Sequence, residues 1–200
     1  ISKLKLETRA KVKELGIKNL EVHSYHSFCV RYYDPECYDD SAITDLLNRC
    51  SEPMQSFDYD IIVLDEAQDI TPTFYRLIRK LYQDNKKIIE EDFDEGCYYS
   101  DEFNTDDEQE QSIENTSEEL QTLICVLGDR RQSIYDFKNA DERYIVFAPQ
   151  LFNFNDYEWE TCELTVSYRI TKRMATFINY CMLDEKKIIA RKKSKFKPRY

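Results

Sequence analysis

The sequence predicts an α/β fold in which helices pack against a parallel β-sheet. The predicted strands at 60–64 and 122–127 are almost entirely apolar, which is typical of parallel strands covered on both faces. A third strand is predicted at 162–166. The three strands end in the polar clusters DEAQD, GDRRQ and SYR. Because ligands of open α/β sheets bind at the carboxyl ends of the strands, these clusters predict one shared site.

The N-terminal part of the chain predicts helices around one short strand. A helix is predicted over residues 3–15 with Gly16 as its stop, and its apolar residues near one face are Leu4, Val12 and Leu15. Residues 19–23 alternate between polar and apolar side chains, which predicts a short strand. The next helix has four side chains on one face, namely Tyr25, Phe28, Cys29 and Tyr32. Residues 34–57 form a connection with a small helix after Ser41.

Two later helices are predicted to begin at a threonine, whose hydroxyl caps the first turn of a helix. Thr71 precedes Pro72, which suits the first helical position, and the apolar face of this helix is Phe74, Leu77, Ile78 and Leu81. Thr171 begins the last helix, whose inward-facing residues are predicted to be Met174, Phe177, Ile178 and Cys181.

One acidic segment accounts for the net charge of −11. Residues 90–119 contain fourteen Asp and Glu and no Lys or Arg, so the remaining chain has 28 basic against 25 acidic residues. We expect this segment to be a solvated, disordered insertion, with a functional acidic element as the alternative. The rest of the chain is mildly basic, and the overall charge therefore does not exclude a nucleic-acid partner.

The cysteines and histidines do not form a recognisable metal or disulfide pattern. Seven cysteines without CxxC spacing indicate reduced thiols in an intracellular protein, nuclear or cytoplasmic. Cys125 and Cys162 lie in apolar runs and are expected in the core. His23 and His26 have no nearby Cys or His partners, so zinc is not predicted. The basic residues after Glu185 suit a nuclear signal, a phosphate-binding patch or a solvated linker.

No targeting or membrane segment is expected from the sequence. No apolar run approaches the ~18–20 residues that span a bilayer, so we expect no membrane association. The N-terminal residues are charged from Lys3 onward, unlike a signal peptide.

The acids that follow the first predicted strand suit metal-assisted hydrolysis. Asp65 is suited to hold Mg²⁺, usually through bound water, because this ion dehydrates reluctantly. Glu66 is suited to polarise the attacking water as a general base. Two exposed loop acids are the alternative for such a pair taken alone.

The later clusters supply groups that suit phosphoryl transfer. Gln132 carries both a donor and an acceptor and suits a sensor of a γ-phosphate, although a polar loop explains GDRRQ taken alone. Arg169 suits the stabilisation of charge that develops on the phosphate. Tyr168 can stack on a base.

DEAQD, GDRRQSIYDFKNA and LTVSYR, in this order, resemble motifs II, III and IV of the UvrD/Rep-like superfamily 1 DNA helicases. The segment VHSYHSF also resembles the family's DNA-contacting TFHS-type segment. The resemblance spans about residues 20–180 and implies a RecA-like P-loop NTPase domain over 1–160, incomplete, and the start of a second RecA-like domain over 161–200. The implied activity is ATP hydrolysis, with Mg²⁺, coupled to movement along single-stranded DNA.

The resemblance assigns a role to each matching position. Asp65 matches the Mg²⁺ acid, Glu66 the general base, Gln132 the γ-phosphate sensor, Tyr168 the adenine-stacking residue and Arg169 the arginine finger. The positions that match DNA contacts are Ser24, His26, Phe137 and Lys138. Motif III usually ends in WRGA, and Phe and Lys at the first two positions keep a stacking face and a charge but lose the bidentate guanidinium.

The sequence of residues 1–200 contains no GxxxxGK[ST] phosphate loop, since its glycines are Gly16, Gly96 and Gly128. The later helicase motifs are also absent from it, which suggests an internal piece of a longer helicase. We expect the isolated chain to bind ATP weakly and not to unwind DNA. Two alternatives remain: a non-catalytic remnant that binds nucleic acid or a protein partner, and an RNA-directed member of the superfamily.

Overall fold

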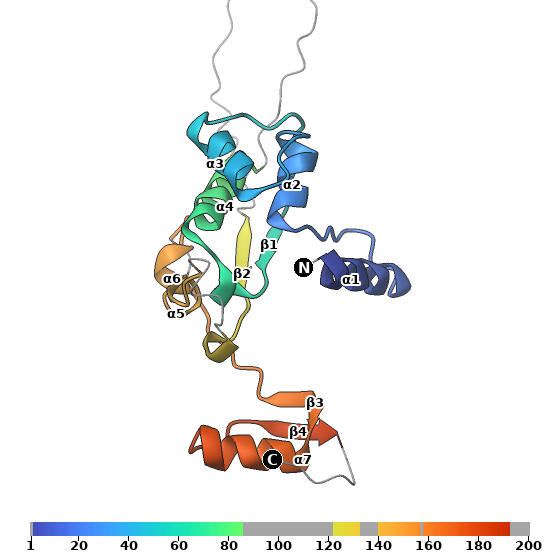
Figure 1. Ribbon diagram of the computed structural model, residues 1–200, viewed down its shortest axis with the longest axis vertical. Coiled ribbons are helices and arrows are strands. Elements are labelled where there is room, and N and C mark those ends of the chain that lie inside the picture. The colour runs from blue at the N-terminus through green and yellow to red at the C-terminus, as the bar shows by residue number, and fades with distance from the viewer. Residues whose placement is uncertain (1, 86–121, 133–139, 157, 193–200) are drawn as a thin grey trace, which may run out of the picture. The chain divides into compact units, whose positions relative to one another are not determined.

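The chain forms two compact units of mixed α/β structure, Ile1–Tyr157 and Glu158–Tyr200, which are described separately below (Figure 1). The computed structural model describes residues 2–85, 122–132, 140–156 and 158–192. The acidic segment 90–119, with its predicted disorder, therefore lies outside the described residues. Within the described ranges, no helix combines the length and apolar character needed to cross a membrane.

Helix α1 (Ser2–Glu14) confirms the first predicted helix and ends where Gly16 adopts a φ of +69°. Its predicted apolar face is not a core face, because Leu15 is exposed and Val12 is half-buried, while the side chain of Leu4 lies outside the described part. The predicted strand at 19–23 is wrong, because this segment has no strand structure. The carbonyl of Val22 accepts a hydrogen bond from Arg9 Nε at 2.8 Å instead of pairing with a strand.

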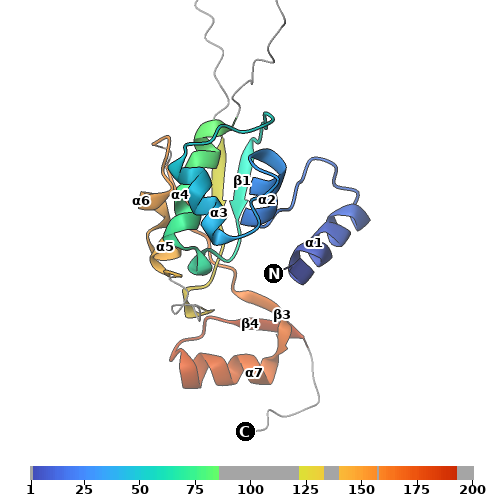
Figure 2. The same cartoon turned by 45° about the horizontal axis from the view of Figure 1, so that its top comes forward.

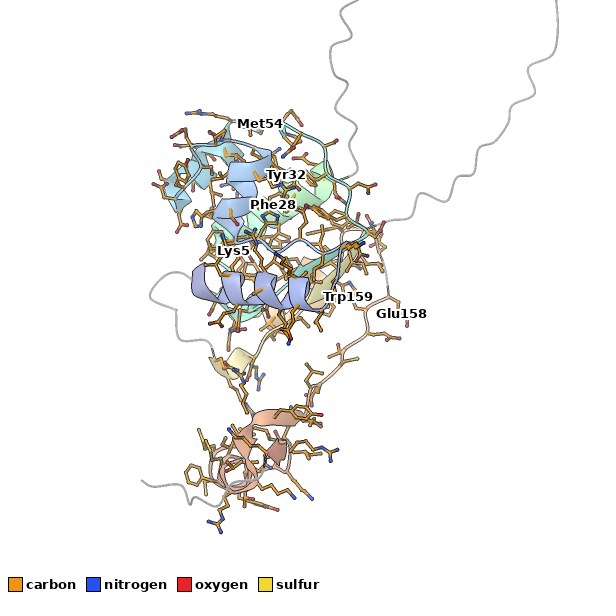
Figure 3. The ribbon with its side chains drawn as sticks, turned by 90° about the vertical axis from the view of Figure 1, so that its right-hand side faces the viewer. Lys5, Phe28, Tyr32, Met54, Glu158 and Trp159 are labelled. Carbon is orange, nitrogen blue, oxygen red and sulfur yellow. The ribbon has the colours of Figure 1, made fainter. Side chains whose placement is uncertain are left out.

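Helices α2 (Tyr25–Tyr32), α3 (Asp40–Asn48) and α4 (Pro72–Asp84) all lie in the first unit (Figure 2). Their buried residues form an aromatic core. Phe28 and Tyr32 lie one turn apart on α2, as Figure 3 shows, with ring centroids 4.6 Å apart. The predicted faces of α2 and α4 are both confirmed, since their apolar residues lie in this core or pack against it, except Ile78, which is buried outside the cluster. The residues buried in the core are Phe28, Cys29, Tyr32, Tyr33, Cys37, Ile43, Leu46, Leu47, Phe57 and Leu77.

Strands β1 (Ile61–Leu64) and β2 (Leu123–Val126) pair in parallel, as the sequence predicts, with Ile61 opposite Leu123 and Leu64 opposite Val126. The prediction that both faces are covered is wrong for the described residues. Side chains alternate between the two faces of a strand, and the face with Ile61, Val63, Leu123 and Cys125 is exposed. Cys125 is therefore not a core residue.

Short helices follow the two strands at the same edge of the sheet. The 3₁₀ turns η1 (Ala67–Asp69) and η2 (Arg130–Gln132) come directly after β1 and β2. Helices α5 (Arg143–Val146) and α6 (Ala148–Leu151) complete the unit, and α5 packs against η1. The amide of Asp141 donates to the carbonyl of Ile70 at 3.1 Å and holds the α5 segment beside η1.

The second unit has its own parallel pair, β3 (Val166–Thr171) and β4 (Ile189–Lys192), with α7 (Lys172–Phe177) and the π-helical turn η4 (Ile178–Met182) between them. The predicted strand at 162–166 begins only at its last residue, because β4 pairs with residues 166–171. Cys162 consequently lies outside the strand and is exposed.

Helix α7 begins at Thr171 as predicted, but its buried face differs from the prediction. Met174, Phe177 and Cys181 are exposed, and Ile178 is half-buried. The buried residues of this segment are Ala175 and Asn179. Helix α7 packs against β4, and the buried residue of each of these two elements is a small one, Ala175 in α7 and Ala190 in β4.

Candidate functional site

The loops after β1 and β2 lie side by side because the strand ladder continues beyond both strands. The amide of Leu127 donates to the carbonyl of Leu64 at 2.8 Å, and the amide of Ala67 donates to the carbonyl of Leu127 at 2.9 Å. The DEAQD and GDRRQ clusters therefore meet at one edge of the sheet, where ligands of parallel sheets bind.

Asp65 and Glu66 are both exposed at this edge. Asp65 Oδ1 accepts the backbone amide of Glu66 at 3.0 Å. Glu66 has a left-handed backbone, with φ 54° and ψ 47°, just before η1. Such a conformation is unfavourable for a residue with a Cβ, and strained positions of this kind are concentrated at functional sites.

Gln68 connects the two loops through a buried carboxamide. Its side chain is only 2 % exposed. Gln68 Nε2 donates to Glu66 Oε2 at 2.7 Å, and Gln68 Oε1 accepts the backbone amide of Asp129 at 3.0 Å. The sequence motif contains this residue, but the sequence alone assigns it no role. The only available signal was its place in the DEAQD cluster that follows β1.

Gln132 lies on η2 and is held by Asp129. Gln132 Nε2 donates to Asp129 Oδ2 at 3.0 Å, and the amide of Arg131 donates to Asp129 Oδ1 at 3.0 Å. Glu66 and Gln132, which the sequence predicts to act together, are therefore joined through Gln68 and Asp129. Asp129 is a second residue to which the sequence assigned no role.

Two further groups near Asp65 and Glu66 have raised pKa values. Burial, together with the charge of Glu66, raises the pKa of Asp69, and Asp69 Oδ1 is buried without a hydrogen-bond partner among the described residues. Burial and, secondarily, the charge of Asp65 raise the pKa of Tyr25, whose ring stacks on Phe74 at 4.3 Å. Helices α2 and α4 thus contribute aromatic side chains beside the acidic loop.

The predicted DNA contacts in the first unit have partners within the protein. Ser24 caps α2, and its hydroxyl accepts the amide of Ser27 at 3.3 Å. His26 Nε2 lies 2.9 Å from Asp40 Oδ1, and its ring meets Phe74 edge to face. Phe137 and Lys138 lie outside the described residues.

Tyr168 and Arg169 lie inside β3 rather than after its end, so their predicted placement at a strand terminus is wrong. The cause is the pairing with β4, which extends the strand to Thr171. Both residues are exposed, Tyr168 by 75 %. They belong to the second unit, and their participation in one site with Glu66 stays a prediction.

Comparison of the sequence with models of known protein families and with curated proteins gives no match.

Proposed function

We propose that the protein is an ATP-driven translocase on single-stranded DNA of the superfamily 1 helicase type, with a RecA-like arrangement in the first unit. The observation that carries the proposal is the connected set Glu66, Gln68, Asp129 and Gln132 at the ends of two parallel strands. A carboxylate general base linked to a neutral polar side chain suits hydrolysis of a phosphate anhydride by an oriented water.

In this proposal the first unit supplies the hydrolytic groups. Glu66 polarises the attacking water, and Gln132 contacts the γ-phosphate. Tyr168 stacks on the adenine, and Arg169 stabilises charge on the transferred phosphate. Both residues belong to the second unit. The proposed DNA contacts are Ser24, His26, Phe137 and Lys138.

Asp65 is suited to bind Mg²⁺ together with the phosphates of a bound nucleotide. The described residues contain no cluster of three or more His, Cys, Asp or Glu that could enclose a metal ion. Mg²⁺ at nucleotide sites is typically bound by one or two carboxylates together with substrate phosphates, and the exposed carboxylate of Asp65 suits this arrangement. When bound, the ion neutralises charge on the phosphates.

The test is ATP hydrolysis by the native protein that contains residues 1–200, measured with and without single-stranded DNA. We expect DNA to stimulate hydrolysis, and we expect Glu66→Gln to lower kcat by about 100-fold or more while nucleotide binding persists. Glu36→Gln is the matched control, because Glu36 is exposed in the turn after α2.

Each possible outcome separates the alternatives. Equal hydrolysis by the Glu66→Gln variant and the wild type contradicts the assignment of the base. Nucleic-acid binding without any hydrolysis in the wild type supports the non-catalytic alternative. Stimulation by single-stranded RNA but not by DNA supports the RNA-directed alternative.

A further inference from the structure

We infer that Gln68 is a positioning residue that couples the carboxylate of Glu66 to the loop that carries Gln132. This inference rests on the proposed function, because it concerns how the proposed base is controlled. It adds a residue, and a route of communication, to which the sequence motifs assign no role.

The Gln68 carboxamide has one donor end and one acceptor end, and each faces a matching group. Its NH₂ group faces an acceptor, the carboxylate of Glu66, and its carbonyl faces a donor, the amide of Asp129. Only this orientation of the amide satisfies both neighbours. A carboxylate at position 68 would keep the bond from Asp129 but would place two negative oxygens side by side. The site is therefore chemically specific for an amide.

Gly128 lies against the Gln68 carboxamide, where there is no room for a larger residue. A Cβ at this position would lie 2.6 Å from Gln68 Oε1, 2.7 Å from Ile145 Cδ1 and 3.0 Å from the amide nitrogen of Ala67. The glycine thus allows the β2 loop to approach the carboxamide closely, and its φ is not in the left-handed region. The close approach of the two loops is built around Gln68.

Asp129 extends the connection from Gln68 to Gln132, the proposed γ-phosphate sensor. Its backbone amide is held by Gln68, while its carboxylate accepts Gln132 Nε2. A movement of Gln132 toward a phosphate changes its bond to Asp129, and the change reaches Glu66 through a single buried side chain. Side-chain hydrogen-bond networks couple their members in this way, and the buried member here is Gln68.

The pairing of β1 with β2 does not depend on the hydrogen bonds of the Gln68 side chain. The backbone bonds between Leu127 and Leu64 and between Ala67 and Leu127 join the two strand ends without Gln68. A substitution that keeps the volume at position 68 is therefore expected to leave the sheet intact. Gln68→Met meets this requirement, since it removes both polar atoms and keeps the chain length.

The kinetic experiment uses Gln68→Met and Gln68→Glu in the native protein. We expect kcat for ATP hydrolysis to fall about tenfold in the first variant, and about 100-fold in the second, with KM for ATP changed less than about threefold. Gln150→Met is the control, because Gln150 is exposed on α6. A kcat of Gln68→Met within about twofold of the wild type, while Glu66→Gln abolishes hydrolysis, overturns the inference and leaves the proposed function intact.

A second readout needs no activity and so separates the two hypotheses if no hydrolysis is found. The Glu66→Gln substitution is expected to shift the Asp129 backbone amide and the Gln132 side-chain amide in ¹H–¹⁵N NMR spectra. The same substitution is expected to leave both signals unshifted in a Gln68→Met background. Equal shifts in the two backgrounds overturn the inference.

Discussion

The two units share a backbone clamp made by a buried asparagine. In the first unit, Asn85 Oδ1 accepts the amide of Tyr59 at 2.9 Å and Asn85 Nδ2 donates to the carbonyl of the same residue at 2.7 Å. In the second unit, Asn179 makes the same pair of bonds with Ile188, both at 2.9 Å. Each clamped residue lies just before a parallel strand, β1 or β4. The clamp thus positions the start of a strand in both units.

The helices that lead to the two clamps differ in what they bury. Helix α4 places Leu77, 1 % exposed, in the aromatic core, whereas α7 leaves Met174 43 % exposed and buries only Ala175. Both helices begin at a threonine cap. A threonine cap and an asparagine clamp therefore occur both in the unit with a large core and in the unit with a small one. Because the caps and clamps are alike, the difference in burial should determine the difference in stability between the units.

The largest expected effect is at the position where the two helices differ most. Leu77→Ala should lower the free energy of unfolding by about 3–4 kcal/mol, because it leaves a cavity in a packed core. Met174→Ala should lower it by less than about 1 kcal/mol, since Met174 is already 43 % exposed in the folded protein. Urea unfolding, with hydrogen exchange to resolve each unit, measures both. Similar losses from the two variants would contradict the comparison.

The next largest effect concerns the clamps. Asn85→Ala and Asn179→Ala should each cost about 2 kcal/mol in the unit concerned, because each removes the acceptor of a backbone amide and a donor to a backbone carbonyl. The carbonyl of Tyr59 keeps a second bond, from Thr122 Oγ1 at 3.2 Å. Asn48→Ala is the control, since exposed Asn48 accepts one bond from Arg76, and its effect should stay within about 0.5 kcal/mol. Hydrogen exchange near Tyr59 and Ile188 locates each loss. Unchanged protection at either residue would show that the clamp is not needed there.

The caps should give equal and smaller losses in the two units. Thr71 and Thr171 each accept an amide at 3.3 Å, from Phe74 and Met174 respectively. Thr71→Ala and Thr171→Ala should each cost about 1 kcal/mol. Thr→Ser at the same positions keeps the hydroxyl and should restore most of the loss. A cap in one unit that costs several times more than the other would show that capping is not a purely local effect.

The smallest effect is expected at the carboxylate of Glu21, whose side chain is 35 % exposed. Burial raises the pKa of Glu21, but hydrogen bonds from His23, Tyr59 and Tyr32, together with the Arg31 guanidinium, hold it below the usual value. Glu21→Gln should cost about 0.5–1 kcal/mol, because the carboxylate is partly exposed and its charge is screened.

The pH dependence of this loss follows from the lowered pKa. A carboxyl with a lowered folded-state pKa stabilises the protein above its unfolded pKa of about 4.3, and this stability is lost as the pH falls through the folded value. The difference in the free energy of unfolding between Glu21→Gln and the wild type should therefore be largest at pH 7. It should disappear as the pH falls below the folded-state pKa of Glu21. Urea unfolding at a series of pH values tests this, and a difference that persists in acid would contradict it.

The predictions from sequence succeeded where a few neighbouring residues decide the structure. The start of α4 at Thr71–Pro72 and the apolar face of α2 depend on side chains three or four residues apart. The strand at 162–166 and the inward face of α7 were predicted wrongly, because the pairing of β3 with β4 and the small contact with Ala190 involve distant residues. The roles of Asp65, Glu66 and Gln132 stay predictions that the geometry supports.

The sequence by itself determined the helix caps, the apolar runs of β1 and β2, and the polar clusters that follow them, because these depend on short-range hydrogen bonds and on hydrophobic patterning. Three features appear only in the tertiary structure. Gln68 accepts a hydrogen bond from the amide of a residue 61 positions away, and Gly128 makes room for this contact. One face of the β1–β2 pair is exposed in the described part of the chain. Such contacts arise when the strands pair in one register, and no local pattern specifies which distant atoms that register brings together.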